Sequence, residues 1–278
     1  MEFVDVGAGR IEYEDTGGDG PVIVLLHGLI MDGSLWRHVL PDLQGDFRCV
    51  LPTLPLGAHR IAMHPGADLS MRAIAGIVGE LLERLDLADA TLVLNDWGGA
   101  LLTLSGPQGD RVARLALCSC EAFENVPPKG AARLLPHVAR VPGGLRAALA
   151  PFALDPLRRL PMTYGPLSAS RVPKQVMDRW FGPVMRDPAV REDLRRYILS
   201  SGASRPLLLR ATEGLASFDR PALVAWAQQD RLMPIEHGPR LAQLLPQGTL
   251  AEIDGSRTLI PQDQPAVLAG HIRRLMER

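Results

Sequence analysis

A carboxylate stands where the chain changes from a strand pattern to a helix pattern. Residues 90–94 form an apolar run of strand length, residues 95–99 read Asn-Asp-Trp-Gly-Gly, and residues 100–104 have helix composition. An Asp is ionised at neutral pH, so Asp96 can attack an sp³ carbon directly and form an ester intermediate. An Asp in such a turn is more commonly a helix N-cap, and only the surrounding frame favours catalysis.

The bulk composition limits the classes of function. A chain of 278 residues, 46% of them hydrophobic, can bury the core of one domain and carry a sizeable insertion. The formal net charge of −1, without a basic stripe, argues against nucleic-acid and membrane-surface binding. The N-terminus is acidic, so no signal peptide is expected. The apolar runs are no longer than strands, so no membrane span is expected. Cys49, Cys118 and Cys120 lie in strand-like runs and are expected to be buried free thiols of a cytoplasmic protein.

The first half of the chain alternates strand and helix patterns. Residues 2–6 and 10–14 predict a hairpin, and Ser70 is a candidate N-cap for a helix over 69–85. Further strands are expected at 21–26, 47–51, 90–94 and 112–118, and a further helix at 34–43. This alternation predicts an α/β fold with a mostly parallel sheet and helices on both faces.

The alternation stops near residue 125. Residues 125–212 contain helical segments interrupted by Pro and Gly, whereas strand patterns return at 221–226 and 250–253 and a closing helix is expected at 266–276. We therefore expect a core formed by 1–124 and 213–278, with a helical cap at 125–212. The cap would cover the carboxyl ends of the strands, where ligands bind in open α/β sheets.

Three segments together resemble one branch of a known superfamily. Residues 27–36 resemble the oxyanion loop of haloalkane dehalogenases and epoxide hydrolases, residues 95–99 resemble their nucleophile elbow, and residues 226–234 resemble the strand and turn that deliver the triad acid. The resemblance covers the core at both ends of the chain. It implies an α/β-hydrolase fold with an eight-stranded sheet and a helical cap.

The resemblance assigns roles to the matching residues. Asp96 would be the nucleophile, and Asp230 the acid that orients a catalytic His, although Asp230 is equally able to cap the helix expected near residue 235. The backbone N–H groups of Trp97 and Leu29 would form the oxyanion hole, the latter in the loop that begins with His27 and Gly28.

The leaving group has several candidate donors. In haloalkane dehalogenases, the Trp after the nucleophile donates its indole N–H to the halide, which would be Trp97 here. The second donor is often an Asn at the position of Leu29, replaced in some members by a cap Trp, for which Trp180 is the candidate. Epoxide hydrolases instead use cap tyrosines, and Tyr164 and Tyr197 lie in the cap region. A lone cap Trp or Tyr is more commonly a packing residue.

One position departs from the pattern of the superfamily. Counting back from Pro265 puts Thr258 where the triad His belongs, and no His lies between His237 and His271, which falls inside the closing helix. The segment 253–265 resembles that of a bacterial α/β-hydrolase subgroup with Ser-Arg-Thr before Asp-Gln-Pro. Loss of a general base typically costs ~10²–10⁴ in rate, so the ester would form but its hydrolysis would stall.

Two groups are candidate substitutes for the missing His. His59 lies in the loop after the strand at 47–51, which usually borders the active site, but a structural role is the more common one for such a residue. Glu121 matches the position of the acid in another dehalogenase subgroup. A pair of Asp96 with Glu121 or Asp230 would raise one pKa towards the range needed for proton transfer.

The expected function is hydrolysis of a C–halide, epoxide or ether bond in a small apolar substrate through Asp96. A non-hydrolytic lyase or isomerase and a ligand-binding pseudoenzyme remain alternatives because the triad His is absent. The expected partner is a small-molecule substrate, with no nucleic acid and no membrane, and a homodimer is a further expectation. No metal and no other cofactor is expected, since no residue cluster has ligand spacing and no Gly-rich phosphate loop follows a strand.

Overall fold

A single eight-stranded sheet organises the computed structural model, which describes residues 1–160 and 163–278. The strand order is β1-β2-β4-β3-β5-β6-β7-β8, with β1 and β2 antiparallel and the strands from β4 to β8 parallel. The strands are β1 (Glu2–Val6), β2 (Gly9–Asp15), β3 (Val22–Leu26), β4 (Arg48–Thr53), β5 (Ala90–Asp96), β6 (Val112–Cys120), β7 (Ala222–Ala227) and β8 (Gly248–Ile253). The expected fold class, mostly parallel and eight-stranded, is confirmed.

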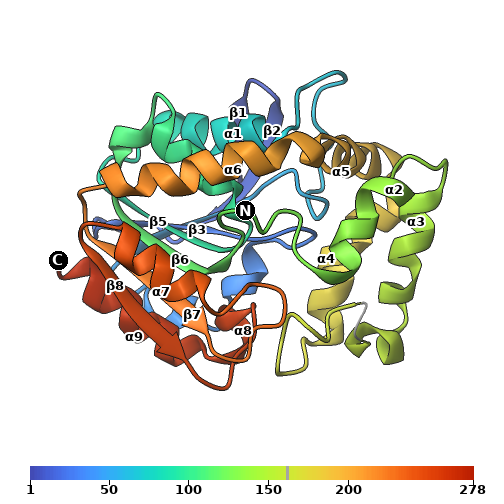
Figure 1. Ribbon diagram of the computed structural model, residues 1–278. Coiled ribbons are helices and arrows are strands. Elements are labelled where there is room, and N and C mark those ends of the chain that lie inside the picture. The colour runs from blue at the N-terminus through green and yellow to red at the C-terminus, as the bar shows by residue number, and fades with distance from the viewer. Residues whose placement is uncertain (161–162) are drawn as a thin grey trace.

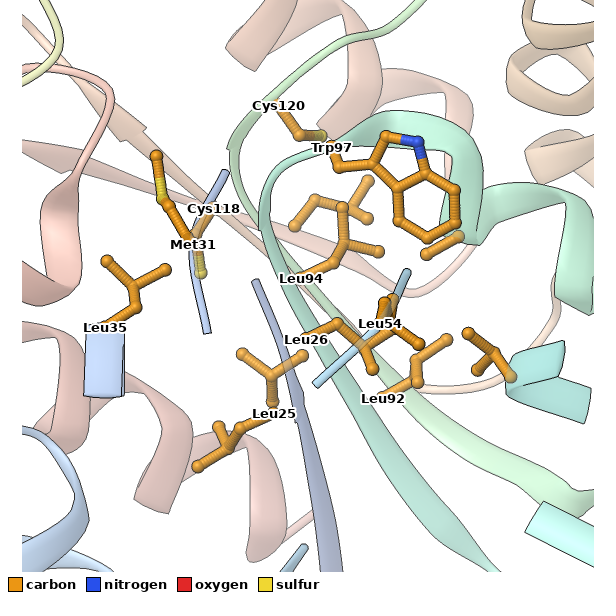
Figure 2. Packing of buried hydrophobic residues seen from close by; sticks show 14 of the residues in the cluster. Leu25, Leu26, Met31, Leu35, Leu54, Leu92, Leu94, Trp97, Cys118 and Cys120 are labelled. Carbon is orange, nitrogen blue, oxygen red and sulfur yellow. The ribbon is translucent and has the colours of Figure 1, made fainter. Parts of the chain in front are cut away.

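The central strands are apolar because helices cover both faces of the sheet. The side chains of β3, β5 and β7 are almost all buried, which explains their unbroken apolar runs in the sequence. Figure 2 shows Leu26, Leu54, Leu92 and Leu94 packed together near the ring of Trp97, at the end of β5. The strand that delivers Asp96 is therefore held rigidly in the core.

Helices on the two faces follow the expected pattern with one exception. Ser70 caps α1 by accepting from the Ala73 N–H at 3.3 Å, as predicted. The helix expected at 34–43 is wrong: Pro41 lacks the N–H needed to continue an α-helix, and two 3₁₀ turns form instead. The core segments are η1 (Gly33–Trp36), η2 (Leu40–Asp42), α1 (Met71–Arg84), η3 (Gly98–Ser105), η4 (Gly109–Arg111), α7 (His237–Leu244), α8 (Ile260–Asp263) and α9 (Pro265–Met276).

Every regular element that the structure describes between β6 and β7 is a helix. These elements are η5 (Gly130–Leu134), α2 (Leu135–Val138), α3 (Gly144–Leu149), η6 (Ala150–Ala153), η7 (Asp155–Arg159), α4 (Lys174–Arg186), α5 (Pro188–Ser200), η8 (Ser201–Ala203), α6 (Ser204–Glu213) and η9 (Gly214–Ser217). Figure 1 shows α2, α3 and α4 grouped to one side of the sheet, whereas α6 runs back over it and contacts η3 and α1. The boundaries of the cap at 125 and 212 stay a prediction. No helix in residues 1–160 or 163–278 has the length and apolar character needed to cross a bilayer.

Candidate active site

The turn at the end of β5 holds Asp96 in a backbone conformation that few side chains adopt. Its φ is +68°, and the N–H of Trp97 donates to the carbonyl of Asn95 at 2.9 Å, which closes the turn. A Cβ on Gly98 would lie 1.9 Å from the carbonyl oxygen of Glu121, so only glycine fits there. Such a strained residue, held by its surroundings, is typical of a functional site.

The loop after β3 lies directly against the Asp96 carboxylate. The N–H of Leu29 donates to Asp96 Oδ2 at 3.2 Å, and a Cβ on Gly28 would lie only 2.0 Å from the same oxygen. The buried ring of His27 shapes this loop, because Nδ1–H donates to the carbonyl of Gly28 and Nε2 accepts from the N–H of Leu54, each at 2.8 Å. Burial lowers the pKa of His27 to about 4, so its ring is neutral. The Leu29 N–H faces the site, while the Trp97 N–H is used by the turn itself.

The two residues expected at the acid and His positions lie in contact. Thr258, fully buried after β8, donates its hydroxyl to Asp230 Oδ1 at 2.9 Å. The same oxygen accepts from the N–H groups of Leu232 and Met233, each at 2.9 Å, so Asp230 also caps the turn after β7. The side-chain N–H₂ of Asn95 donates to the carbonyl of Thr258 at 2.7 Å and ties this loop to the elbow. The helix that Asp230 was alternatively expected to cap, α7, begins at residue 237 and is not capped by it.

Three carboxyl groups meet at this site with raised pKa values. Burial raises the pKa of Asp96 to about 7, the Leu29 N–H opposes the rise, and the charge of Asp230 adds to it. Burial and then the charge of Asp96 raise the pKa of Glu121 well above its ordinary value, and burial also raises that of Asp230. Glu121 Oε2 and Asp230 Oδ2 are buried without a hydrogen-bond partner among the described residues. Burial and the nearby negative charges therefore favour the protonated form of these carboxyl groups more than solvent would.

The two candidate tyrosines differ in what their hydroxyl groups contact. Tyr197, on α5, accepts the indole N–H of Trp97 at 2.9 Å, which leaves its own O–H available as a donor. Burial raises the pKa of Tyr197 well above its ordinary value, so it is a neutral phenol. Tyr164 donates to the carbonyl of Ile30 at 3.3 Å and so supports the oxyanion loop. Of the two, Tyr197 is the one beside Trp97.

Trp180, the candidate for a second halide donor, has its indole N–H engaged with core oxygens in this structure. It donates to Ser34 Oγ at 2.9 Å and to Asp32 Oδ1 at 3.2 Å. Trp180 is fully buried, so this N–H has to be satisfied by nearby oxygens. The residue therefore joins α4 to the oxyanion loop.

His59, the candidate substitute base, is engaged with a buried carboxylate in this structure. Its Nε2 lies 3.1 Å from Asp193 Oδ2, and its Nδ1 accepts from the N–H of Gly57 at 3.3 Å. Asp193 also accepts from the N–H of Met63 and from Arg196, which fixes the pair between the loop and α5. With both nitrogens engaged in a buried pair, the ring is a structural link. Among the described residues, no histidine is hydrogen-bonded to Asp96 or Asp230.

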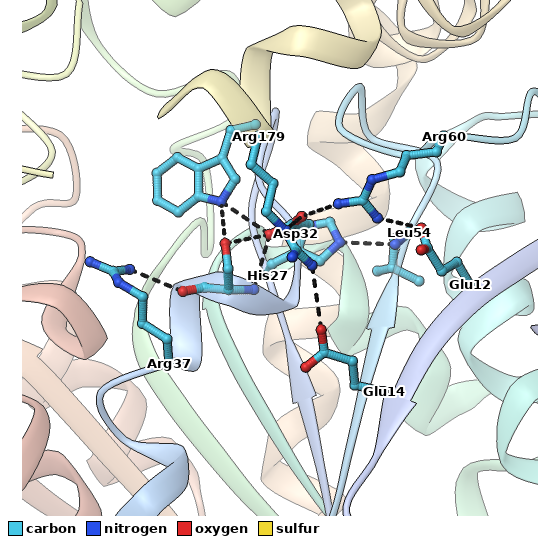
Figure 3. A network of polar contacts seen from close by, with 10 residues as sticks. Glu12, Glu14, His27, Asp32, Arg37, Leu54, Arg60 and Arg179 are labelled. Atoms are coloured by element: carbon cyan, nitrogen blue, oxygen red, sulfur yellow. Dashed lines mark hydrogen bonds and ion pairs between the residues drawn. The ribbon is translucent and has the colours of Figure 1, made fainter. Parts of the chain in front are cut away.

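Asp32 is a buried carboxylate that joins α4 to the loop after β3. Its role was not predicted from the sequence. Asp32 is fully buried and contacts Arg60 at 2.9 Å, Arg179, and the N–H and hydroxyl of Ser34 (Figure 3). The cations come from the loop after β4 and from α4, far from Asp32 along the chain. The only local signal is the Asp-Gly-Ser sequence, which predicts an N-cap and not an ion-pair network.

Replacing Asp32 by Ala is expected to lower the free energy of unfolding by about 3–5 kcal/mol, because two guanidinium groups and an indole N–H lose a buried partner. Urea denaturation measures the change. The matched control is Asp5→Ala, which removes an exposed ion pair with Arg10 and is expected to change the stability little. Equal small effects of both substitutions would contradict an anchoring role for Asp32.

Within the described parts of the chain, no group of three or more His, Cys, Asp or Glu side chains is arranged to hold a metal ion. The three carboxyl groups of the site come from the ends of β5, β6 and β7. Cys49, Cys118 and Cys120 are buried free thiols, as expected.

Comparison with known proteins agrees with the fold. Residues 21–261 match the family model of the alpha/beta hydrolase fold. A cis-3-alkyl-4-alkyloxetan-2-one decarboxylase of Xanthomonas campestris is 26% identical over 291 residues, covering 99% of this chain and 95% of the relative. Haloalkane dehalogenase 2 of Mycobacterium tuberculosis is 26% identical over 276 residues, covering 97% and 92%.

Solved structures show the same architecture. A haloalkane dehalogenase from Bradyrhizobium elkani superposes with a TM-score of 0.77 at 20% identity, covering 99% of this chain and 98% of that one. Since the family model spans most of the chain and the strand order agrees with it, this protein belongs to the alpha/beta hydrolase fold family.

Proposed function

We propose that this protein is an enzyme in which the Asp96 carboxylate attacks carbon in a small apolar substrate and forms an ester intermediate. The observation that carries the proposal is the position of this carboxylate, at a strained elbow against the Leu29 N–H. Relatives named as a dehalogenase and a decarboxylase support enzymatic chemistry on small molecules. C–halide, epoxide and lactone C–O bonds are the candidate bonds.

The first step needs Asp96 ionised. Because its pKa lies at about 7, a substantial fraction is a carboxylate at neutral pH, and this fraction rises as the pH rises. The departing group would be stabilised by the Tyr197 hydroxyl, which the Trp97 indole N–H polarises by donating to it. A departing oxygen suits this donor pair better than a halide, because the indole N–H is already engaged and Leu29 provides no side-chain donor.

The second step has to release the ester. Hydrolysis requires a group that deprotonates water, and the Asp230 carboxyl contacts the Thr258 hydroxyl where such a His would stand. Glu121, with its unpartnered Oε2, is the remaining candidate, but its raised pKa favours the protonated form, which cannot take a proton from water. Without a His, a reaction whose second step needs no water is the better match.

A four-membered lactone, the substrate class in the name of the Xanthomonas relative, allows such a second step. Attack by Asp96 on the sp³ ring carbon bonded to the ring oxygen forms the ester, breaks the bond between that carbon and the ring oxygen, and releases the lactone carboxylate. The carboxylate then leaves as CO₂, the electron pair of its C–C bond forms an alkene, and the ester C–O bond breaks to restore the Asp96 carboxylate. Atoms and charge balance without water. We therefore favour decarboxylative elimination from a lactone and keep haloalkane or epoxide hydrolysis as the second candidate.

Product analysis with intact-mass measurement tests the proposal. The protein is incubated with alkyl-substituted β-lactones, haloalkanes and epoxides, and adducts are recorded together with released products. Alkene and CO₂ from the lactones, without an alcohol product, is the expected result. Alcohol or diol release would favour hydrolysis, and a stable adduct on Asp96 would locate the block at ester release. Neither adduct nor product from any substrate would contradict the proposal and favour a binding protein.

A further inference from the structure

A groove lined by cations lies beside the acid side of the site. Its volume is about 450 Å³, within the range of small-molecule sites. Its lining includes Lys129, Arg231 and Arg257, and no acidic side chain among the residues that the structure describes. The other lining residues are Gly130, Gly165, Pro166 and Leu232. Small-molecule anions therefore match its charge.

Residues that line the groove lie next in sequence to residues of the site. Arg231 directly follows Asp230, and Arg257 directly precedes Thr258. The N–H of Leu232, in the groove wall, donates to Asp230 Oδ1 at 2.9 Å. The opposite wall, at Gly165 and Pro166, belongs to the segment before α4, which passes beside α8 in Figure 1. The groove thus opens where the helical insertion meets the core.

The three cations keep their charges available. Arg257 donates to the carbonyl oxygens of Gly165 and Ser168, which positions its guanidinium without neutralising it. Lys129 and Arg231 are exposed. Within the described residues, none of the three forms an ion pair with a carboxylate. This contrasts with Arg60 and Arg179, which are neutralised by Asp32.

We propose that this groove binds an oxyanion group, carboxylate or phosphate, on the end of the substrate remote from the reacting carbon. The proposal refines the small apolar substrate of the proposed function to one whose remote end carries a negative charge, and it rests on the proposed function for the identity of the ligand as a substrate. The reacting, apolar part would extend past Leu232 towards Asp96. Convergent cations at a groove mouth also raise the local concentration of an anionic ligand and speed its encounter with the site.

Binding of small probes tests this inference without any turnover. Hexanoate, inorganic phosphate and hexanol are titrated into ¹⁵N-labelled protein at constant ionic strength, and shifts are followed at residues 231, 232 and 257. Hexanoate is expected to shift these signals saturably. Hexanol has the same chain length but no charge, and it is expected to leave the signals unchanged. Phosphate binding as tight as hexanoate would identify a phosphate-type headgroup, while weaker phosphate binding would identify a carboxylate with an apolar chain.

Charge reversal of the exposed cations gives the decisive comparison. Lys129→Glu with Arg231→Glu is expected to weaken hexanoate binding by roughly tenfold or more, because attraction becomes repulsion at short range. Arg72→Glu on α1, also exposed, is the control and should change binding less than about twofold because screening limits distant charges. Equal losses in both variants, no saturable shifts, or equal shifts with hexanol would overturn the inference.

The Asp96→Asn variant distinguishes this inference from the proposed function, because the variant should still bind hexanoate. If that variant binds hexanoate while the wild-type protein shows no turnover, the groove stands and the proposed function falls. Turnover by the wild-type protein without anion binding would support the proposed function and overturn the inference about the groove.

Discussion

Replacing Asp96 by Asn is expected to lower turnover by at least about 10⁴-fold, because an amide cannot attack carbon as the carboxylate does and reacting groups carry effects of this size. Single-turnover rates and intact mass on the active substrate of the panel measure the loss, and no adduct should form on residue 96. Asp254→Asn, an exposed carboxylate after β8, is the control and should retain full activity. Adduct formation in Asp96→Asn would place the reacting group elsewhere.

The same substitution is expected to stabilise the fold at alkaline pH. The pKa of Asp96 rises from 3.8 in the unfolded chain to about 7 in the folded protein, so the folded state retains the proton between these values. Folding stability attributable to this group therefore falls as the pH rises from about 4 to about 7, and the penalty is complete above 7. The full rise corresponds to at most about 4 kcal/mol, and partial contact with solvent reduces this to about 1–2 kcal/mol.

Thermal unfolding at two pH values checks this. Asp96→Asn should raise the melting temperature at pH 8 and have little effect at pH 4, where the carboxyl is protonated in both states. A loss of activity combined with a gain in stability would show that the site is maintained at the expense of the fold. Equal melting temperatures of variant and wild type at pH 8 would contradict the raised pKa.

Replacing Thr258 by His is expected to raise hydrolysis of the Asp96 ester by about 10²–10⁴-fold, since it restores a general base in contact with Asp230. With haloalkanes, a stable adduct in the wild-type protein would become multiple-turnover release of alcohol. With lactones, alcohol would appear beside the alkene. The measurement is the ratio of hydrolysis product to adduct or alkene.

The position is fully buried, so the larger ring carries an overpacking cost of about 1–3 kcal/mol. Circular dichroism and urea denaturation establish that the variant is folded. Thr258→Val, which removes the hydroxyl and adds no base, is the matched control and should show no gain in hydrolysis. A folded Thr258→His variant that still accumulates adduct would show that water, and not only a base, is excluded from the ester.

The positions of the strands along the chain and the helical segments between β6 and β7 could be predicted from the sequence because they depend on local pattern. Buried parallel strands need continuous apolar runs, and β3, β5 and β7 have them. The elbow could be predicted for the same reason, since strand, turn and helix are adjacent in the chain. The helix predicted at 34–43 does not form, because Pro41 lacks the N–H that would continue it, and two 3₁₀ turns form instead.

The roles of the histidine and tryptophan candidates could not be predicted from spacing. His59 is paired with Asp193, 134 residues away, and Trp180 is paired with Asp32, 148 residues away. From the sequence alone, neither ring has an evident hydrogen-bond partner. Their partners are determined by which polar groups become buried together, and a buried donor or acceptor takes whichever partner lies within reach.

By itself the sequence determined that a carboxylate follows the strand at 90–94 and that no His lies between residues 237 and 271, and it predicted the helical segments between β6 and β7. Only the tertiary structure decided that Thr258 contacts Asp230, that Tyr197 and not Tyr164 lies beside Trp97, and that three carboxyl groups share the site. The physical reason is that residue type and local conformation are encoded along the chain, whereas burial, pairing and pKa depend on distances between segments that meet only when the sheet has formed.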